Sequence, residues 1–69
     1  TMSEFVRKEF LRFIYQFILN KKYSTAGKLI DFLIENDKDI DLVNWYLEFK
    51  ELLYGRPLII CQRIRDYLR

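Results

Sequence analysis

The chain has 69 residues and a formal net charge of +2; 51% of its residues are hydrophobic, 17% are aromatic, one is Cys and none is His. This length accommodates one domain, and so apolar a composition excludes intrinsic disorder. The lone Cys61 excludes an intramolecular disulfide, and the lack of histidine excludes histidine-based catalysis and disfavours a structural zinc site.

The first predicted helix spans residues 3–20, with Ser3 as its N-cap. At 100° of rotation per residue its apolar arc is about 200° wide, against the ~100° that a surface helix needs. We therefore expect it to pack on two sides. The residues of this arc are Val6, Phe10, Phe13, Ile14, Phe17 and Ile18, flanked by Leu11 and Tyr15.

The second predicted helix follows the connection formed by residues 21–23. Ser24 or Thr25 is its expected cap, and it ends near Asn36. On its polar side Lys28 and Asp31 are expected to pair three residues apart. Its apolar face consists of Ala26, Leu29, Ile30, Phe32 and Leu33.

The third predicted helix starts near Asp39 or Asp41, after the polar break at residues 37–39, and ends at Tyr54. Gly55 then suits a position of positive φ, and Pro57 suits the first position of a fourth helix that reaches at least Leu68. The expected core residues of these two helices are Leu42, Trp45, Tyr46, Phe49, Leu52 and Leu53, then Ile60, Cys61, Ile64, Tyr67 and Leu68.

This pattern predicts an all-α fold of four amphipathic helices, because no stretch of sufficient length shows the alternation of apolar and polar residues that is typical of a β-strand. Short connections make neighbouring helices antiparallel, so two antiparallel helical hairpins are expected. The two halves also align at an offset of 35 residues, which places Ile14 on Phe49 and Ala26 on Cys61. A repeat-like pair of hairpins and a compact bundle both fit.

Two families share parts of this pattern. The aromatic Phe10, the Tyr23-x-x-Ala26 spacing and the large Ile30 four residues later make residues 10–69 similar to a tetratricopeptide repeat. That resemblance implies helical hairpins that bind proteins. Residues 11–32, with Ala26-Gly27 near the turn, also resemble the LisH motif, which implies a homodimerisation element.

The side chains that could act in catalysis or metal binding are all better explained by structural roles. Cys61 lies on the apolar face of its helix with no histidine to activate it, so we expect it to be a packed small hydrophobe. Residues 29–41 contain five acids and one Lys, which we interpret as helix-surface and capping charge. We therefore expect no enzyme activity, no cofactor and no metal site.

The apolar residues that fit no core face predict a protein interface. Large exposed apolar patches usually mark interfaces, and we expect these residues to form one contiguous patch. The candidates are Phe5, Leu19, Val43, Leu47, Tyr54, Leu58 and Ile59, with Arg63 and Arg65 on the rim.

The expected function is protein–protein interaction, as an adaptor or assembly domain whose partner is another protein or a second copy of the chain. Residues 56–69 sum to +3, so weak nucleic-acid binding is an alternative, but the whole-chain charge of +2 and the lack of a reading motif disfavour it.

Location and origin follow from the ends of the chain and its apolar runs. No run approaches the ~18 residues of a membrane-spanning helix, and charges near the N-terminus disfavour a signal peptide. We expect an intracellular protein, cytoplasmic or nuclear, that does not associate with membrane. Thr1 before Met2 reads as a cloning remnant, and the uncapped end at Arg69 predicts that residues 1–69 are one domain of a longer protein.

Overall fold

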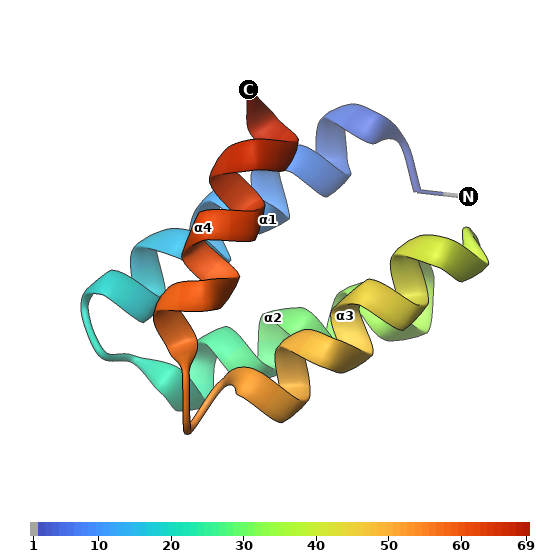
Figure 1. The fold of residues 1–69 in the computed structure, drawn as a ribbon. Helices are drawn as coiled ribbons and strands as arrows, with labels where there is room; N and C mark the ends of the chain where they lie inside the picture. The colour runs from blue at the N-terminus through green and yellow to red at the C-terminus, as the bar shows by residue number, and fades with distance from the viewer. Residues whose placement is uncertain (1) are drawn as a thin grey trace.

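A computed structural model describes residues 2–69 and shows an all-helical domain of four helices. Figure 1 shows α1 (Glu4–Leu19) lying beside α4 (Pro57–Leu68), and α2 (Tyr23–Asn36) lying beside α3 (Ile40–Leu52). The α1–α2 and α3–α4 connections lie at one end of the molecule, which we call the loop end. Thr1, predicted to be a cloning remnant, lies outside the described residues.

The predicted caps of α1 and α3 are confirmed. The Ser3 hydroxyl accepts a hydrogen bond from the Val6 amide at 3.1 Å. The Asp39 carboxylate accepts from the amides of Asp41 and Leu42 at 3.0 and 3.3 Å, so Asp39 is the cap and Asp41 lies in the first turn. These bonds satisfy amides that have no partner within the helix.

The predicted cap of α2 is wrong. The helix begins at Tyr23, before Ser24 and Thr25, and its N-cap Lys22 makes no side-chain capping bond. The connection is tight because Lys21 adopts a left-handed conformation, with φ of 61°, and the Lys22 amide donates to the Phe17 carbonyl at 2.8 Å. The chain is therefore already turned into the helix direction at Tyr23.

The end of α3 also differs from the prediction. The helix ends at Leu52 rather than Tyr54, and Gly55 does not have a positive φ. The Gly55 and Arg56 amides both donate to the Leu52 carbonyl, at 3.1 and 2.7 Å, so right-handed turns close the connection. Pro57 opens α4 at its first turn, as predicted.

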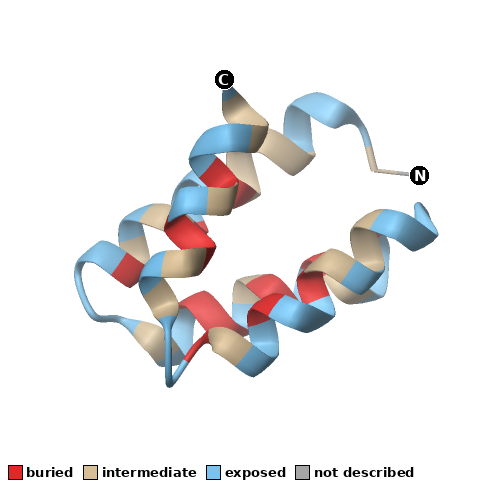
Figure 2. Ribbon diagram, viewed as in Figure 1, coloured by how far each residue is buried: buried red, intermediate tan, exposed pale blue. Residues whose placement is uncertain are grey.

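The core lies between the α1–α4 pair and the α2–α3 pair, as the buried segments in Figure 2 indicate. Half of the predicted core positions are buried and most of the others are partly buried, whereas Leu11, expected only at the flank, is fully buried. The buried apolar residues are Leu11, Ile14, Ile18, Ala26, Ile30, Leu33, Tyr46, Phe49, Leu53, Ile60, Cys61 and Ile64.

Gly27 is buried as well and allows α2 and α3 to approach closely. A Cβ placed on it would lie 3.2 Å from the Leu53 Cδ2 atom. The same helix pair is bridged by Asp31 and Lys50, whose charged atoms lie 3.0 Å apart. Asp31 therefore pairs with Lys50 across the two helices. The sequence had predicted a pair with Lys28 on the same helix instead.

Three residues assigned to the core are exposed instead: Val6, Phe13 and Phe32. On α1 the buried face is centred on Leu11, Ile14 and Ile18. Val6 and Phe13 lie about 100° or more around the helix from that centre, beyond the reach of α2 and α4. The wide apolar arc of α1 is thus only partly covered.

Candidate protein interaction surface

A groove at the loop end is lined by parts of α1, α2 and α4. Its volume is about 400 Å³. Because α1 and α3 both end here and α2 and α4 both begin here, residues far apart in sequence meet (Figure 1). The lining, which we call the loop-end groove, consists of Ile18, Leu19, Lys21, Tyr23, Gly55, Arg56, Pro57, Leu58 and Ile59.

Four of the predicted interface residues converge at this groove. Leu19, Leu58 and Ile59 line it. Tyr54 adjoins it, because its ring meets the Tyr23 ring edge-on, with centroids 6.2 Å apart. Leu58 is 67% exposed and Tyr54 is 74% exposed, whereas Ile59 is half-buried. The groove thus joins apolar side chains from three helices.

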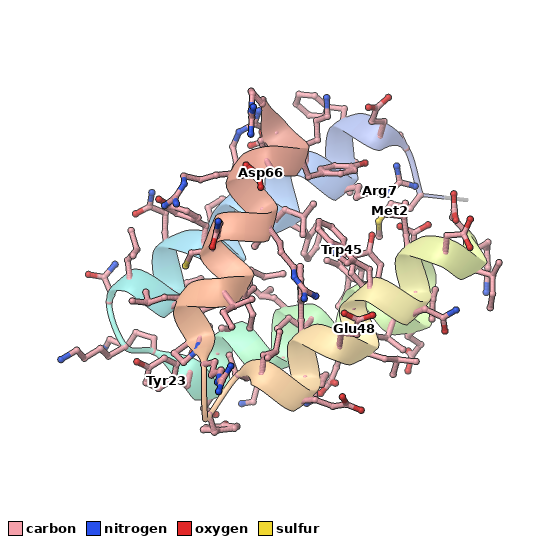
Figure 3. All side chains as sticks on the ribbon, in the orientation of Figure 1. Met2, Arg7, Tyr23, Trp45, Glu48 and Asp66 are labelled. Carbon is pink, nitrogen blue, oxygen red and sulfur yellow. The ribbon has the colours of Figure 1, made fainter. Side chains whose placement is uncertain are left out.

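Tyr23 is a groove residue that sequence analysis placed in a connection. Figure 3 shows it at the loop end, below the start of α4. As the first residue of α2 it faces both the groove and Tyr54. The sequence does contain an indication of this position. Tyr23 follows Lys21 and Lys22 in a connection that is too short to hold the ring away from the neighbouring helices.

The loop-end groove is positively charged. Lys21 and Arg56 line it, Lys22 adjoins it, and none of its nine lining residues is acidic. None of the six ion pairs found among residues 2–69 involves these three cations. The two helices that begin here, α2 and α4, have no acidic residue in their first turns. Their N-terminal dipoles therefore add to the positive potential.

The other predicted interface residues lie elsewhere, so the single contiguous patch is wrong. Phe5 is exposed in the first turn of α1, fourteen residues and roughly 20 Å along the helix from Leu19. Leu47 is exposed on α3, and Val43 is half-buried against the core. The reason is the layout of the helices, since Phe5 lies at the far end of α1 and α3, which carries Val43 and Leu47, contributes no residue to the lining of the groove.

The two predicted rim arginines are also away from the groove. Arg63 pairs with Glu48 of α3, with a 2.6 Å separation between Nη1 and Oε1. Arg65 donates a hydrogen bond to the Tyr15 hydroxyl at 3.2 Å, and this contact raises the pKa of Arg65. Both side chains therefore tie α4 to its neighbours. The groove has its rim from Lys21, Lys22 and Arg56 instead.

A second apolar surface runs along the outer side of α1 and α2. Phe10 and Phe32 stack with centroids 4.7 Å apart and planes within 7°. Phe13 is 55% exposed, and Val6 is also exposed. A groove of about 360 Å³ lies at the start of α1, lined by Met2, Ser3, Val6, Phe10, Phe32 and Asn36. The predicted width of the apolar arc was the signal for this surface.

A third groove, of about 540 Å³, lies between α1 and the end of α4, and its charges are mostly paired. Arg12 forms an ion pair with Glu9, and Arg69 pairs with Asp66 at 2.6 Å. With Arg65 bound to Tyr15, this groove offers no cluster of unpaired cations to an anion.

A buried polar cluster, formed by Arg7, Asp37 and Tyr46, lies between α1 and α3. Asp37 is only 4% exposed. Its carboxylate accepts from Arg7 Nε at 2.7 Å, Arg7 Nη2 at 3.2 Å and the Tyr46 hydroxyl at 2.6 Å. Arg7 lies near Met2 in Figure 3. The cluster is not predictable from the sequence, where Asp37 belongs to the polar break between two helices.

The charges in this cluster shift each other's ionisation. The Arg7 guanidinium, assisted by hydrogen bonds from Tyr46 and the Asp39 amide, holds the pKa of Asp37 at about 2. Burial, together with the neighbouring Asp37 carboxylate, raises the pKa of Tyr46. No buried side-chain N or O atom among residues 2–69 lacks a partner. Arg7, Asp37 and Tyr46 therefore form a closed link between helices, which we call the buried clamp.

Cys61 is buried, as predicted, next to the α1 backbone. Its Sγ lies 4.0 Å from the Tyr15 carbonyl oxygen. Burial raises the pKa of the Cys61 thiol, which the Arg65 charge opposes. The thiolate is therefore disfavoured. Among residues 2–69, no group of three or more Cys, Asp or Glu side chains is placed to hold a metal ion.

Comparisons of the chain with protein-family models, with curated proteins and with solved structures find no match. The tetratricopeptide and LisH resemblances therefore stay predictions. No helix among residues 2–69 combines the length and the apolar content needed to cross a bilayer.

Proposed function

We propose that this domain is a protein–protein interaction module that binds its partner through the loop-end groove. The observation that carries the proposal is the convergence of Leu19 from α1, Leu58 and Ile59 from α4, and Tyr54 from the α3–α4 connection on one groove with a basic rim. Interaction hot spots commonly combine aromatic or aliphatic side chains at the centre with charged groups around them.

The exposure of these side chains supports the proposal energetically. Tyr54 and Leu58 are both exposed for two thirds of their surface or more, in a domain whose core already holds twelve apolar residues. Burying such surface against a partner contributes roughly 25 cal/mol per Å². The groove and its surroundings therefore offer a favourable contact that the isolated domain leaves unused.

The proposed setting is an adaptor or assembly role inside the cell. The tetratricopeptide-like pattern supports it, and so does the single cysteine, Cys61, which has no partner in the chain for a disulfide. Homodimerisation, suggested by the LisH-like residues, is the alternative form of the same activity. The apolar surface of α1 and α2, around the stacked Phe10 and Phe32, is the observation that favours it.

Site-specific photo-crosslinking in the full-length protein tests the proposed contact. A benzophenone amino acid replaces Leu58 in the groove, and a matched protein carries it at Gln62, one turn further along the exposed side of α4. In the native cell we expect a discrete protein adduct from position 58 and at least tenfold less from position 62.

The charge variant Leu58→Glu supplies the second arm of this test. An acidic residue is favourable in the first turn of a helix, so the domain is expected to stay folded. The variant should lose the partner that is captured from Tyr54, where the same probe is placed. Equal adducts from positions 58 and 62, or capture unaffected by Leu58→Glu, would contradict the proposal.

A further inference from the structure

The end of the domain opposite the loop end carries an exposed apolar residue among acids. Ile40, the first residue of α3, is 69% exposed. Asp39 and Asp41 flank it, Glu35 is exposed in the last turn of α2, and Lys38 is the only nearby cation in the sequence from 35 to 41. We call residues 38–41 and Glu35 the acidic end.

Asp37 does not contribute free charge there, because Arg7 neutralises it. The acidic end therefore presents three exposed carboxylates against one ammonium, around one aliphatic side chain. This combination is complementary to the loop-end groove, where Lys21 and Arg56 line an apolar depression and Lys22 adjoins it in sequence. Both surfaces belong to the same chain.

We propose that the loop-end groove binds the acidic end of a second copy of this chain. Ile40 of one copy enters the groove beside Leu19 and Leu58 of the next. Asp39 and Asp41 then lie near Lys21, Lys22 and Arg56. The apolar contact supplies affinity, and the opposite charges set the orientation and the rate of association.

The geometry makes this association head-to-tail. The groove lies where α2 begins, and the acidic end lies where α2 ends, fourteen residues and roughly 20 Å away (Figure 1). Because the two surfaces lie at opposite ends of α2, we expect one copy to place its acidic end in the groove of the next while its own groove stays free. Each added copy leaves one groove and one acidic end free, so the assembly grows into a chain or closes into a ring.

This inference rests on the proposed function, since it names the partner of the same groove. The first measurement is sedimentation velocity of the full chain over micromolar to millimolar concentrations. We expect the mass to rise past that of a dimer in ~50 mM salt. Raising salt to ~500 mM should weaken the association several-fold, because exposed charges are then screened.

Complementary variants provide the decisive test. Leu58→Glu disables the groove and Ile40→Lys disables the acidic end, so each alone is expected to associate at least tenfold more weakly than the natural chain. Mixed in equal amounts they retain one intact groove and one intact acidic end. The mixture should form a one-to-one dimer that grows no further. Gln62→Glu is the matched control and should associate like the natural chain.

Each outcome is decisive for one of the two proposals. A natural chain that stays monomeric throughout, that stops at a dimer, or whose variants fail to complement each other overturns head-to-tail association. If position 58 then still crosslinks to a different protein, the interaction function stands with another partner. If neither self-association nor a position-58 adduct is found, both proposals fail. Circular dichroism of both variants confirms that they remain helical.

Discussion

Replacing Asp37 with alanine is expected to destabilise the domain by about 3 kcal/mol or more. The substitution leaves the Arg7 guanidinium, which is only 13% exposed, without its carboxylate, and it also removes the acceptor of the Tyr46 hydroxyl. A domain of this size has a total unfolding free energy of roughly 3–10 kcal/mol. Urea unfolding followed by circular dichroism should show the midpoint falling steeply.

Two further variants separate the clamp from general effects. Tyr46→Phe removes only the hydroxyl that donates to Asp37, and its expected cost is about 1–2 kcal/mol. Asp31→Ala removes an exposed carboxylate paired with Lys50 and should cost less than about 1 kcal/mol. Equal losses for Asp37→Ala and Asp31→Ala would show that the buried clamp does not stabilise the fold.

The same clamp gives the stability a defined acid dependence. The Arg7 guanidinium lowers the pKa of Asp37 from its ordinary value of 3.8 to about 2. A depressed carboxyl pKa stabilises the folded state above the unfolded-state value, and the stabilisation is lost as pH falls toward 2. This amounts to about 2 kcal/mol. If Asp37→Asn loses stability as steeply between pH 4 and 2, the assignment to Asp37 is incorrect.

Truncating Phe49 to alanine should have the second large effect, a loss of about 3–5 kcal/mol. Phe49 is fully buried, and its ring packs against Trp45 with centroids 4.6 Å apart. Trp45 in turn contacts Tyr67 of α4, with centroids 5.4 Å apart. The cavity would therefore lie where α3 meets α4, and the measurement is again urea unfolding by circular dichroism.

Phe49→Leu is the matched control for this cavity. It keeps most of the buried volume, so its cost should be about 1–1.5 kcal/mol. Trp45, the only tryptophan, reports on the site directly, because its fluorescence should shift to longer wavelength when water enters beside it. A stable Phe49→Ala variant with unchanged Trp45 emission would mean that the ring is not part of a packed core.

The starts of the helices were predictable wherever residues close in sequence determine them. Ser3 and Asp39 cap their helices with their own oxygens, and Pro57 fixes φ at the start of α4. The start of α2 was not predictable in this way. It depends on the left-handed turn at Lys21, a conformation that lysine does not specify.

The groove that we propose as an interaction surface was predictable in part. Leu19, Leu58 and Ile59 were identified because they fall outside the core faces of their own helices. That they meet in one groove depends on the helix arrangement, which periodicity does not determine. Phe13 and Phe32 lie on apolar stripes as wide as a core face, so only the positions of the neighbouring helices show that they are exposed.

The buried clamp was the least predictable feature. Asp37 is one of several acids between α2 and α3, and its neighbours Lys38 and Asp39 are exposed. What buries it is Arg7, thirty residues earlier, together with Tyr46 on the next helix. A single sequence contains no signal that connects these three positions.

The position of α1 has a consequence for synthesis on the ribosome. This first helix packs against both α2 and α4, and the Tyr15 backbone meets Cys61, forty-six residues later. When α1 and α2 emerge they can pair as a local hairpin, but the flank of α1 that α4 covers stays open to water. The nascent chain therefore exposes Tyr15 and its neighbours to chaperones until the last helix has left the exit tunnel.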